Sequence, residues 1–305
     1  MPTITTPTTG IELFYEDHGD PAHPPILLVM GLGAQLTLWP DEFVEALVTR
    51  GFRVIRFDNR DIGLSQKMAG ERPPKVLWQV LWTKLGFPPR VPYTLTDMAD
   101  DAAGLMDALS IDRAHVVGAS MGGMIAQLMA VHHPDRLLTL TSIFSTTGNP
   151  KLPKAEKEAM DALTAPLESL DEEVVVAHGI RVQRAIGSPA YRPSEEKIRE
   201  RVLKTVRRSV YPDGLPRQLA AIIEDGDRRD RLARVTAPTL VMHGEDDPLV
   251  KVEAGEDTAM AISGARLVTI PGWGHDLPVE LVERLADEIA SHARAAQSTA
   301  TTIAG

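Results

Sequence analysis

Residues 114–123 read AHVVGASMGG, an apolar run that leads into a serine flanked by small residues. The apolar run is typical of a buried strand, and the apolar residues 121–132 predict a helix. A serine on so sharp a turn has a strained backbone, and glycines two positions before and after it relieve the crowding. Ser120 is therefore a candidate nucleophile at the carboxyl end of a strand.

The same turn predicts an anion site made of backbone amides. Met121 begins the expected helix, where unpaired N–H groups and the helix dipole favour negative charge. A second amide is expected from residues 30–33, MGLG, with the Leu32 N–H as the donor. Two alternatives are a phosphate-binding loop, whose Lys-Ser/Thr ending is absent here, and an ordinary strand-end role for Leu32. The amides of Leu32 and Met121 together predict an oxyanion hole.

One histidine is placed to serve as a base, which a serine hydroxyl needs because it is a weak nucleophile on its own. His275 ends the loop PGWGH, residues 271–275, between an apolar run at 266–270 and an amphipathic segment at 279–294. A loop at this place can hold an imidazole over the carboxyl edge of a sheet. The other eight histidines fit packing, capping or surface positions.

The acid that orients this base is expected after the preceding apolar run, residues 239–242. The loop there offers three carboxylates: Glu245, Asp246 and Asp247. Asp247 is the preferred candidate because it stands three residues after Gly244 and is held by the proline that follows it. Asp246 is the alternative. Another possible place for the acid, residues 145–149, contains no carboxylate.

Short runs rich in Val, Ile and Leu alternate with longer amphipathic segments, the pattern of a mostly parallel α/β sheet. The predicted strands are residues 26–30, 53–57, 115–118, 137–144, 239–244 and 266–270. Residues 11–16 predict an antiparallel strand at the edge of the sheet. The predicted helices are residues 40–49, 96–109, 121–132, 253–262 and 279–294.

Two regions interrupt this alternation. About 90 residues separate the strands near 144 and 239, whereas a crossover connection needs only a dozen or so. We therefore predict a catalytic core at residues 1–145 and 217–305 with a helical cap at 146–216. The second region is residues 66–93, where Trp78 and Trp82 fit one packed helix face or the lining of an entrance.

The composition excludes several classes of protein. Hydrophobic residues at 43% and charged residues at 24% fit a globular chain. A formal charge of −10 without a local basic cluster argues against nucleic acid as a partner. The chain has no cysteine, and no apolar stretch approaches the roughly 20 residues of a membrane helix. With no export signal in residues 1–19, the sequence predicts a cytoplasmic protein without membrane insertion.

The order Ser120, Asp247, His275 and the loops that carry them resemble the α/β-hydrolase family over about residues 10–292. Three segments are similar to the aclacinomycin methylesterase-like carboxylesterases: LLVMG at 27–31, AHVVG at 114–118 and IPGWGH at 270–275. The resemblance implies an eight-stranded, mostly parallel sheet with helices on both faces. It also implies hydrolysis of a small apolar carboxylic ester by a serine hydrolase that needs neither cofactor nor metal.

One departure from the broader family is Met30, because many members have a histidine before the oxyanion glycine. The methylesterase group shares the methionine, and backbone donors do not depend on that side chain. The same triad also serves lactonases, thioesterases, amidases, perhydrolases and acyltransferases, which remain alternatives, as does a small-molecule receptor with little turnover. Halide or epoxide displacement needs a carboxylate at position 120. No pattern indicates an oligomeric state.

Overall fold

The computed structural model describes residues 2–72 and 91–304, and within them eight strands form one sheet in the order β1-β2-β4-β3-β5-β6-β7-β8. The strands are β1 (Thr3–Thr5), β2 (Glu12–His18), β3 (Pro25–Val29), β4 (Arg53–Phe57), β5 (Ala114–Ala119), β6 (Leu137–Ile143), β7 (Thr239–Gly244) and β8 (Arg266–Ile270). From β4 to β8 all neighbours are parallel. The predicted α/β fold and its strands are confirmed.

One strand prediction needs correction. Residues 11–16 were expected at the edge of the sheet, and β2 does run antiparallel to β4. The edge itself is β1, which pairs antiparallel with the other side of β2, with Thr3 opposite Phe14. The sequence gives no signal for β1 because its three residues, TIT, are too few and too polar to show the period of a buried strand.

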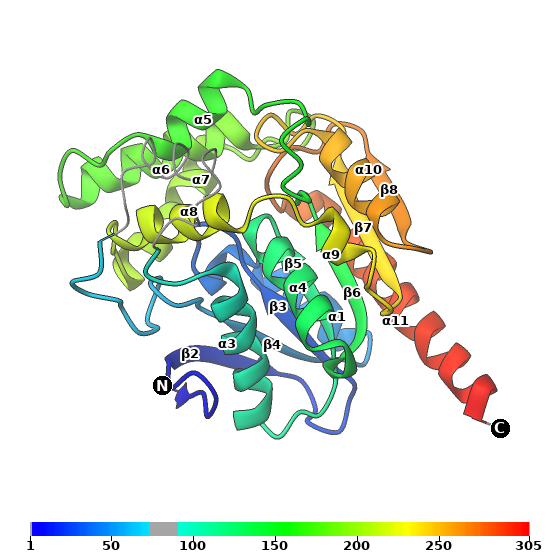
Figure 1. Cartoon of the computed structure of the whole chain (residues 1–305). Coiled ribbons are helices and arrows are strands. Elements are labelled where there is room, and N and C mark those ends of the chain that lie inside the picture. The colour runs from blue at the N-terminus through cyan, green and yellow to red at the C-terminus, as the bar shows by residue number, and fades with distance from the viewer. Residues whose placement is uncertain (1, 73–90, 305) are drawn as a thin grey trace.

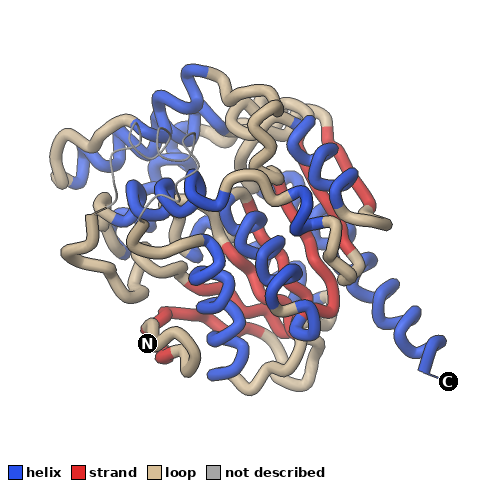
Figure 2. Tube along the Cα trace, in the orientation of Figure 1, coloured by secondary structure: helices blue, strands red, loops and turns tan. Residues whose placement is uncertain are grey.

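Helices cover both faces of the sheet, as Figures 1 and 2 show. The helices of the core are α1 (Asp41–Thr49), α3 (Leu95–Ala108), α4 (Met121–His132), α9 (Arg229–Leu232), α10 (Val252–Ala261) and α11 (Val282–Ala304). Short 3-10 turns are η1 (Leu36–Leu38), η2 (Pro134–Arg136) and η3 (Val279–Leu281). The five predicted helices are all present, although the last begins as η3 and extends ten residues further than expected.

The core consists of two apolar layers, one on each side of the sheet. Successive residues of a strand point to opposite faces. Leu27 accordingly packs in the layer with α3 and α4, whereas its neighbours Ile26 and Leu28 pack in the layer with α1 and α11. Because both faces are covered, the central strands are mostly apolar, which explains why their positions could be predicted from the sequence.

Five helices lie between β6 and β7, and four of them gather beyond one end of the sheet (Figure 1). They are α5 (Lys157–Thr164), α6 (Glu172–Ile186), α7 (Glu195–Arg208) and α8 (Gly214–Asp225). Val176, Ile180 and Ile198 form a small apolar cluster between α6 and α7. The expected boundary between residues 216 and 217 falls inside α8, which also packs against α3. Trp78 and Trp82 lie outside the described residues.

Among residues 2–72 and 91–304, none of the helices combines the length and the apolar character that crossing a bilayer requires.

Candidate active site

Ser120 occupies a strained turn between β5 and α4. Its φ of 57° and ψ of −122° lie in a region that residues with a side chain rarely adopt. The strain is supported by close contacts that only glycine permits. A Cβ on Gly118 would lie 2.1 Å from the Gly122 carbonyl oxygen, and one on Gly122 would lie 2.0 Å from the Val29 carbonyl oxygen. The two glycines therefore allow strand, turn and helix to cross closely enough to present Ser120.

Hydrogen bonds from β6 and the residues after it fix this turn. The Ser120 N–H donates to the Ile143 carbonyl at 2.9 Å, and the Ser145 hydroxyl donates to the Ser120 carbonyl at 2.7 Å. A Cβ on Gly123 would lie 2.5 Å from the Ser145 Cβ. Both the N–H and the carbonyl of Ser120 are thus held by hydrogen bonds, and the small Ser145 side chain packs against the turn. Sequence reasoning did not find Ser145, because a serine after a strand carries no distinctive signal.

His275 lies between Ser120 and Asp247. Its Nε2 is 2.9 Å from the Ser120 Oγ, and its Nδ1 is 2.6 Å from an Asp247 carboxylate oxygen. An ionised carboxylate can only accept, so Nδ1 carries the proton and Nε2 is free to accept the Ser120 hydroxyl proton. The imidazole is 8% exposed and packs against the Phe144 ring, with centroids 4.6 Å apart. The three candidates from the sequence are therefore brought together in a nearly dry site.

The two neighbouring aspartates have different environments. Asp247 is fully buried, and its second carboxylate oxygen accepts hydrogen bonds at 2.8 Å from the amides of Leu249 and Val250. Asp246 is exposed, and its carboxylate accepts a hydrogen bond at 2.7 Å from the Gly272 amide. The geometry thus joins Asp247 to His275 and gives Asp246 a role in holding the loop that leads to His275.

A second histidine stands behind Asp247. The His243 Nε2 lies 2.8 Å from the Val250 carbonyl oxygen and 3.7 Å from the Asp247 carboxylate. Burial lowers the pKa of His243, so its imidazole is neutral and Nε2 donates to the carbonyl. Asp247 therefore contacts two imidazoles. That of His275 also faces the Ser120 hydroxyl, and that of His243 packs behind the carboxylate.

The last residue of α6 and the residues after it, 186–190, run beside the His275 loop and hold it. The His275 N–H donates to the Ile186 carbonyl at 2.8 Å, and the Gly274 N–H donates to the Ser188 hydroxyl oxygen at 2.9 Å. The Ser188 hydroxyl donates in turn to the Asp276 carboxylate, and burial raises the pKa of Asp276. This contact could not be predicted from the sequence, because it joins residues almost 90 positions apart.

The two candidate oxyanion donors lie on either side of the nucleophile. Met121 is the first residue of α4, so its N–H has no acceptor within the helix. The loop that contains Leu32 approaches so closely that a Cβ on Gly31 would lie 3.0 Å from the Ser120 Cβ. The Asn59 side chain donates to the Met30 carbonyl at 2.8 Å and fixes the start of this loop. Both predicted amides thus belong to segments that border Ser120.

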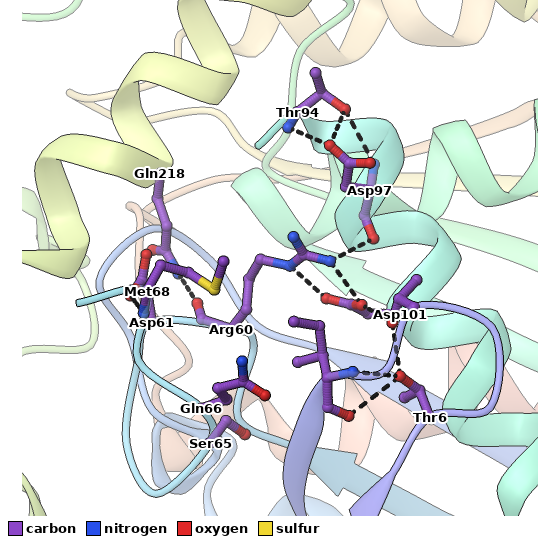
Figure 3. Close-up of polar contacts among 12 residues, drawn as sticks. Thr6, Arg60, Asp61, Ser65, Gln66, Met68, Thr94, Asp97, Asp101 and Gln218 are labelled. Carbon is purple, nitrogen blue, oxygen red and sulfur yellow. Dashed lines mark hydrogen bonds and ion pairs between the residues drawn. The ribbon is translucent and has the colours of Figure 1, made fainter. Parts of the chain in front are cut away.

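Charged residues after β4 form buried contacts in this region, and Figure 3 shows those of Arg60. The Arg60 guanidinium forms two hydrogen bonds to Asp101, at 2.6 and 2.7 Å. Asp61 is paired with Arg217 of α8 at 2.7 Å, and Asp58 forms an ion pair with Arg208 of α7. These contacts tie the charged turn after β4 to α3, α7 and α8.

A cavity of about 930 Å³ opens between α5, α6 and α7, away from Ser120. Most of its charged lining residues are paired, as in the ion pairs of Arg184 with Glu195 and of Lys157 with Asp161. Within the described part of the chain, no group of three or more histidine or acidic side chains is arranged to hold a metal ion.

Comparison with known proteins agrees with this geometry. Residues 24–280 match the model of the α/β hydrolase fold family. Rhodomycin D methylesterase of Streptomyces peucetius is 31% identical over 316 aligned residues, covering 97% of this chain and 99% of the relative. The resemblance to the methylesterase group is thereby confirmed.

Two solved structures are also similar. A hydrolase from Pseudomonas aeruginosa is 30% identical with a TM-score of 0.70, covering 95% of this chain and 97% of that one. A thermophilic esterase from Thermogutta terrifontis is 28% identical with a TM-score of 0.72, covering 97% and 98% of the two chains. The family match spans most of the sequence, and the observed sheet has the expected strands. The chain belongs to the α/β hydrolase fold family.

Proposed function

We propose that the protein is a carboxylic ester hydrolase that works through an acyl-enzyme on Ser120, with His275 as general base and Asp247 as the acid that orients it. The observation that carries the proposal is the position of His275, whose two ring nitrogens lie within 2.9 Å of the Ser120 hydroxyl and 2.6 Å of the Asp247 carboxylate. This arrangement activates a serine hydroxyl, which is otherwise a weak nucleophile.

In the first half of the reaction, the Ser120 Oγ attacks the ester carbonyl carbon while His275 Nε2 takes the hydroxyl proton. Negative charge develops on the carbonyl oxygen, and the N–H groups of Leu32 and Met121 are the donors that stabilise it. His275 then gives its proton to the leaving alcohol oxygen. The carbon–oxygen bond of the ester breaks, and the acyl group stays on Ser120.

In the second half, a water molecule replaces the alcohol. His275 Nε2 takes a proton from this water, which attacks the acyl carbon, and the same two amides stabilise the second oxyanion. Collapse of that intermediate returns the proton to Ser120 and releases the acid. Asp247 remains ionised throughout and keeps the imidazole in the tautomer with the proton on Nδ1.

The substrate class is inferred from the relatives, and the helical insertion is proposed to cover the site. Relatives named as methylesterases favour a methyl or other small alkyl ester as the substrate. We propose that residues 146–216 act as a cap over Ser120. This segment contacts the His275 loop through Ile186 and Ser188, which supports a location over the site. The apolar Val176 packs inside the insertion and therefore gives no information on the substrate.

The test is a burst and steady-state assay with methyl esters and with p-nitrophenyl esters of increasing acyl length, together with a serine-directed phosphonate located by mass spectrometry. Turnover with the label on Ser120 is the expected result. Faster cleavage of lactones or thioesters would mean that one of these, and not an open-chain ester, is the substrate. Transfer of the acyl group to an added alcohol would mean that the protein is an acyltransferase. Labelling without any turnover would favour a receptor, and no labelling would overturn the assignment of the nucleophile.

A further inference from the structure

The loop that carries the Leu32 amide is a tight turn. The Ala34 N–H donates to the Gly31 carbonyl at 3.3 Å, which closes a four-residue turn with Leu32 and Gly33 at its centre. Gly33 has a φ of +66°, the sign that a type II turn requires at its third position. Among the described residues, the Leu32 N–H has no acceptor, so it is available to a ligand.

A turn of this kind has two competing forms. Types I and II share the same closing hydrogen bond and differ by the orientation of the central peptide, here the one between Leu32 and Gly33. A glycine at the third position tolerates both forms. The sequence of the turn by itself therefore does not fix its central peptide, and an outside contact is needed to select one form. The Leu32 N–H belongs to the peptide before the central one and has the same direction in both forms, so an outside contact acts on it by holding the whole turn in place.

Gln218 of α8 supplies such a contact. Its Oε1 accepts a hydrogen bond from the Gly33 N–H at 2.9 Å, and its Nε2 donates to the Arg60 carbonyl at 2.9 Å. Figure 3 shows the second of these bonds. The side chain is completely buried. Because the amide oxygen has a donor and the amide nitrogen has an acceptor, the Gln218 side chain has one orientation. Its oxygen can accept from the Gly33 N–H in only one orientation of the central peptide.

The far end of this contact is rigid. Arg60, whose carbonyl receives the Gln218 amide, is held by two hydrogen bonds to the buried Asp101. Leu215 of the same helix packs on the turn, since a Cβ on Gly33 would lie 3.0 Å from its Cδ1. The helix α8 thus fixes the turn both by a directional bond and by contact.

We propose that Gln218 is a positioning residue for the oxyanion hole, which holds in place the turn that carries the Leu32 amide, so that this amide stays directed at the reacting carbonyl oxygen. The inference rests on the proposed ester hydrolysis. Donors that are already oriented stabilise the developing oxyanion without reorganisation, and a donor that must first be oriented contributes less. Gln218 acts on the transition state through the turn, and substrate binding does not depend on it.

The test uses Gln218→Met, which keeps the volume of the side chain and removes both hydrogen bonds. The variant is compared with the wild type per Ser120 site titrated with the phosphonate. The expected result is a fall in kcat of about 10- to 100-fold with KM nearly unchanged, as for a weakened oxyanion donor. An alkyl boronic acid, which forms a tetrahedral adduct with serine, should lose affinity by the same factor.

Gln127→Met is the matched control. Gln127 is also a fully buried amide with two partners, the Ser142 hydroxyl and the Arg228 guanidinium, but it does not contact the turn. This variant should lose stability while keeping kcat per titrated site. If Gln218→Met does not fold, Gln218→Asn, which withdraws the amide by one methylene, should give the same loss of kcat.

The proposal is overturned if Gln218→Met and Gln127→Met have the same kcat and KM per titrated Ser120. It is also overturned if kcat of Gln218→Met falls while its affinity for the boronic acid does not. Failure of the proposed function has a different signature. The wild type would then show neither ester turnover nor labelling of Ser120, whatever residue stands at position 218.

Discussion

The His275 Nε2 lies 2.9 Å from the Ser120 Oγ although 155 positions separate the two residues in the chain. The contact depends on three supports. The strained elbow presents the serine, the buried Asp247 holds the far side of the imidazole, and the Ile186 carbonyl accepts the His275 amide. These three segments belong to different connections between strands of the sheet. The contact between His275 and Ser120 therefore forms only when strands β5 to β8 and the insertion between β6 and β7 are assembled.

Replacing the nucleophile should abolish turnover. In Ser120→Ala we expect kcat for p-nitrophenyl esters to fall by at least about 10⁴-fold, because the remaining groups have no oxygen to acylate. The fold should persist, since the Cβ that occupies the elbow is retained. Circular dichroism and the melting temperature are the controls. Wild-type activity in a sample free of contaminating esterase would contradict the assignment.

The two aspartates of the loop after β7 should differ sharply. Asp247→Asn leaves the imidazole in the wrong tautomer, so kcat should fall by about 10⁴-fold. In Asp246→Asn the amide oxygen can still accept from the Gly272 N–H, and kcat should change by less than about threefold. Steady-state kinetics on the matched pair decide between them, and a larger loss in the Asp246 variant would reverse the assignment.

The buried ion pair between Asp61 and Arg217 should be costly to break from one side. The two side chains are 0% and 5% exposed, so Arg217→Met leaves a buried, uncompensated carboxylate. We expect the free energy of unfolding to fall by about 3–5 kcal/mol in denaturant titration.

Two further variants test that mechanism. The double variant Asp61→Asn, Arg217→Met should recover much of the loss, because it removes the charge and asparagine tolerates the φ of +71° at this position. Arg207→Met, which breaks the exposed pair with Glu172, should leave the free energy of unfolding almost unchanged. No recovery in the double variant would mean that lost packing, not the unpaired charge, causes the effect.

His115 should make the protein sensitive to acid. Burial in β5, with His292 and Arg113 nearby, lowers the pKa of His115 to about 4 from an ordinary value near 6.5. Between these values the unfolded chain binds a proton that the folded chain excludes, so stability is complete above pH 6.5 and falls as the pH drops toward 4.

The change to test is His115→Leu, which cannot titrate. From pH 7 to pH 4.5 the wild type should lose about 2 kcal/mol more unfolding free energy than this variant. Urea titrations at the two pH values measure the difference. His23→Leu is the control, since that side chain is exposed in the folded chain and should leave the wild-type pH dependence in place. If the wild type and His115→Leu lose the same unfolding free energy between pH 7 and pH 4.5, groups other than His115 cause the loss of stability in acid.

Much of the architecture could be read from the sequence because it depends on local patterns. Strands buried on both faces are mostly apolar, and the glycines at 118 and 122 are required by contacts near 2 Å. The strand β1 could not be found in this way, because it owes its existence to pairing with β2 and has no apolar period of its own. Ser188 and Gln218 were missed for a similar reason, since each acts by contacting a loop distant in sequence.

The sequence by itself determined the elbow at Ser120, the loop of His275 and the order of the elements, since these follow from steric and periodic rules that act within a dozen residues. Only the tertiary structure distinguished Asp247 from Asp246. The two carboxylates are adjacent and chemically alike, and what separates them is the direction of each side chain in the turn after β7. One points into a dry pocket toward His275 and the other toward the Gly272 amide at the surface, a choice that depends on the surrounding packing.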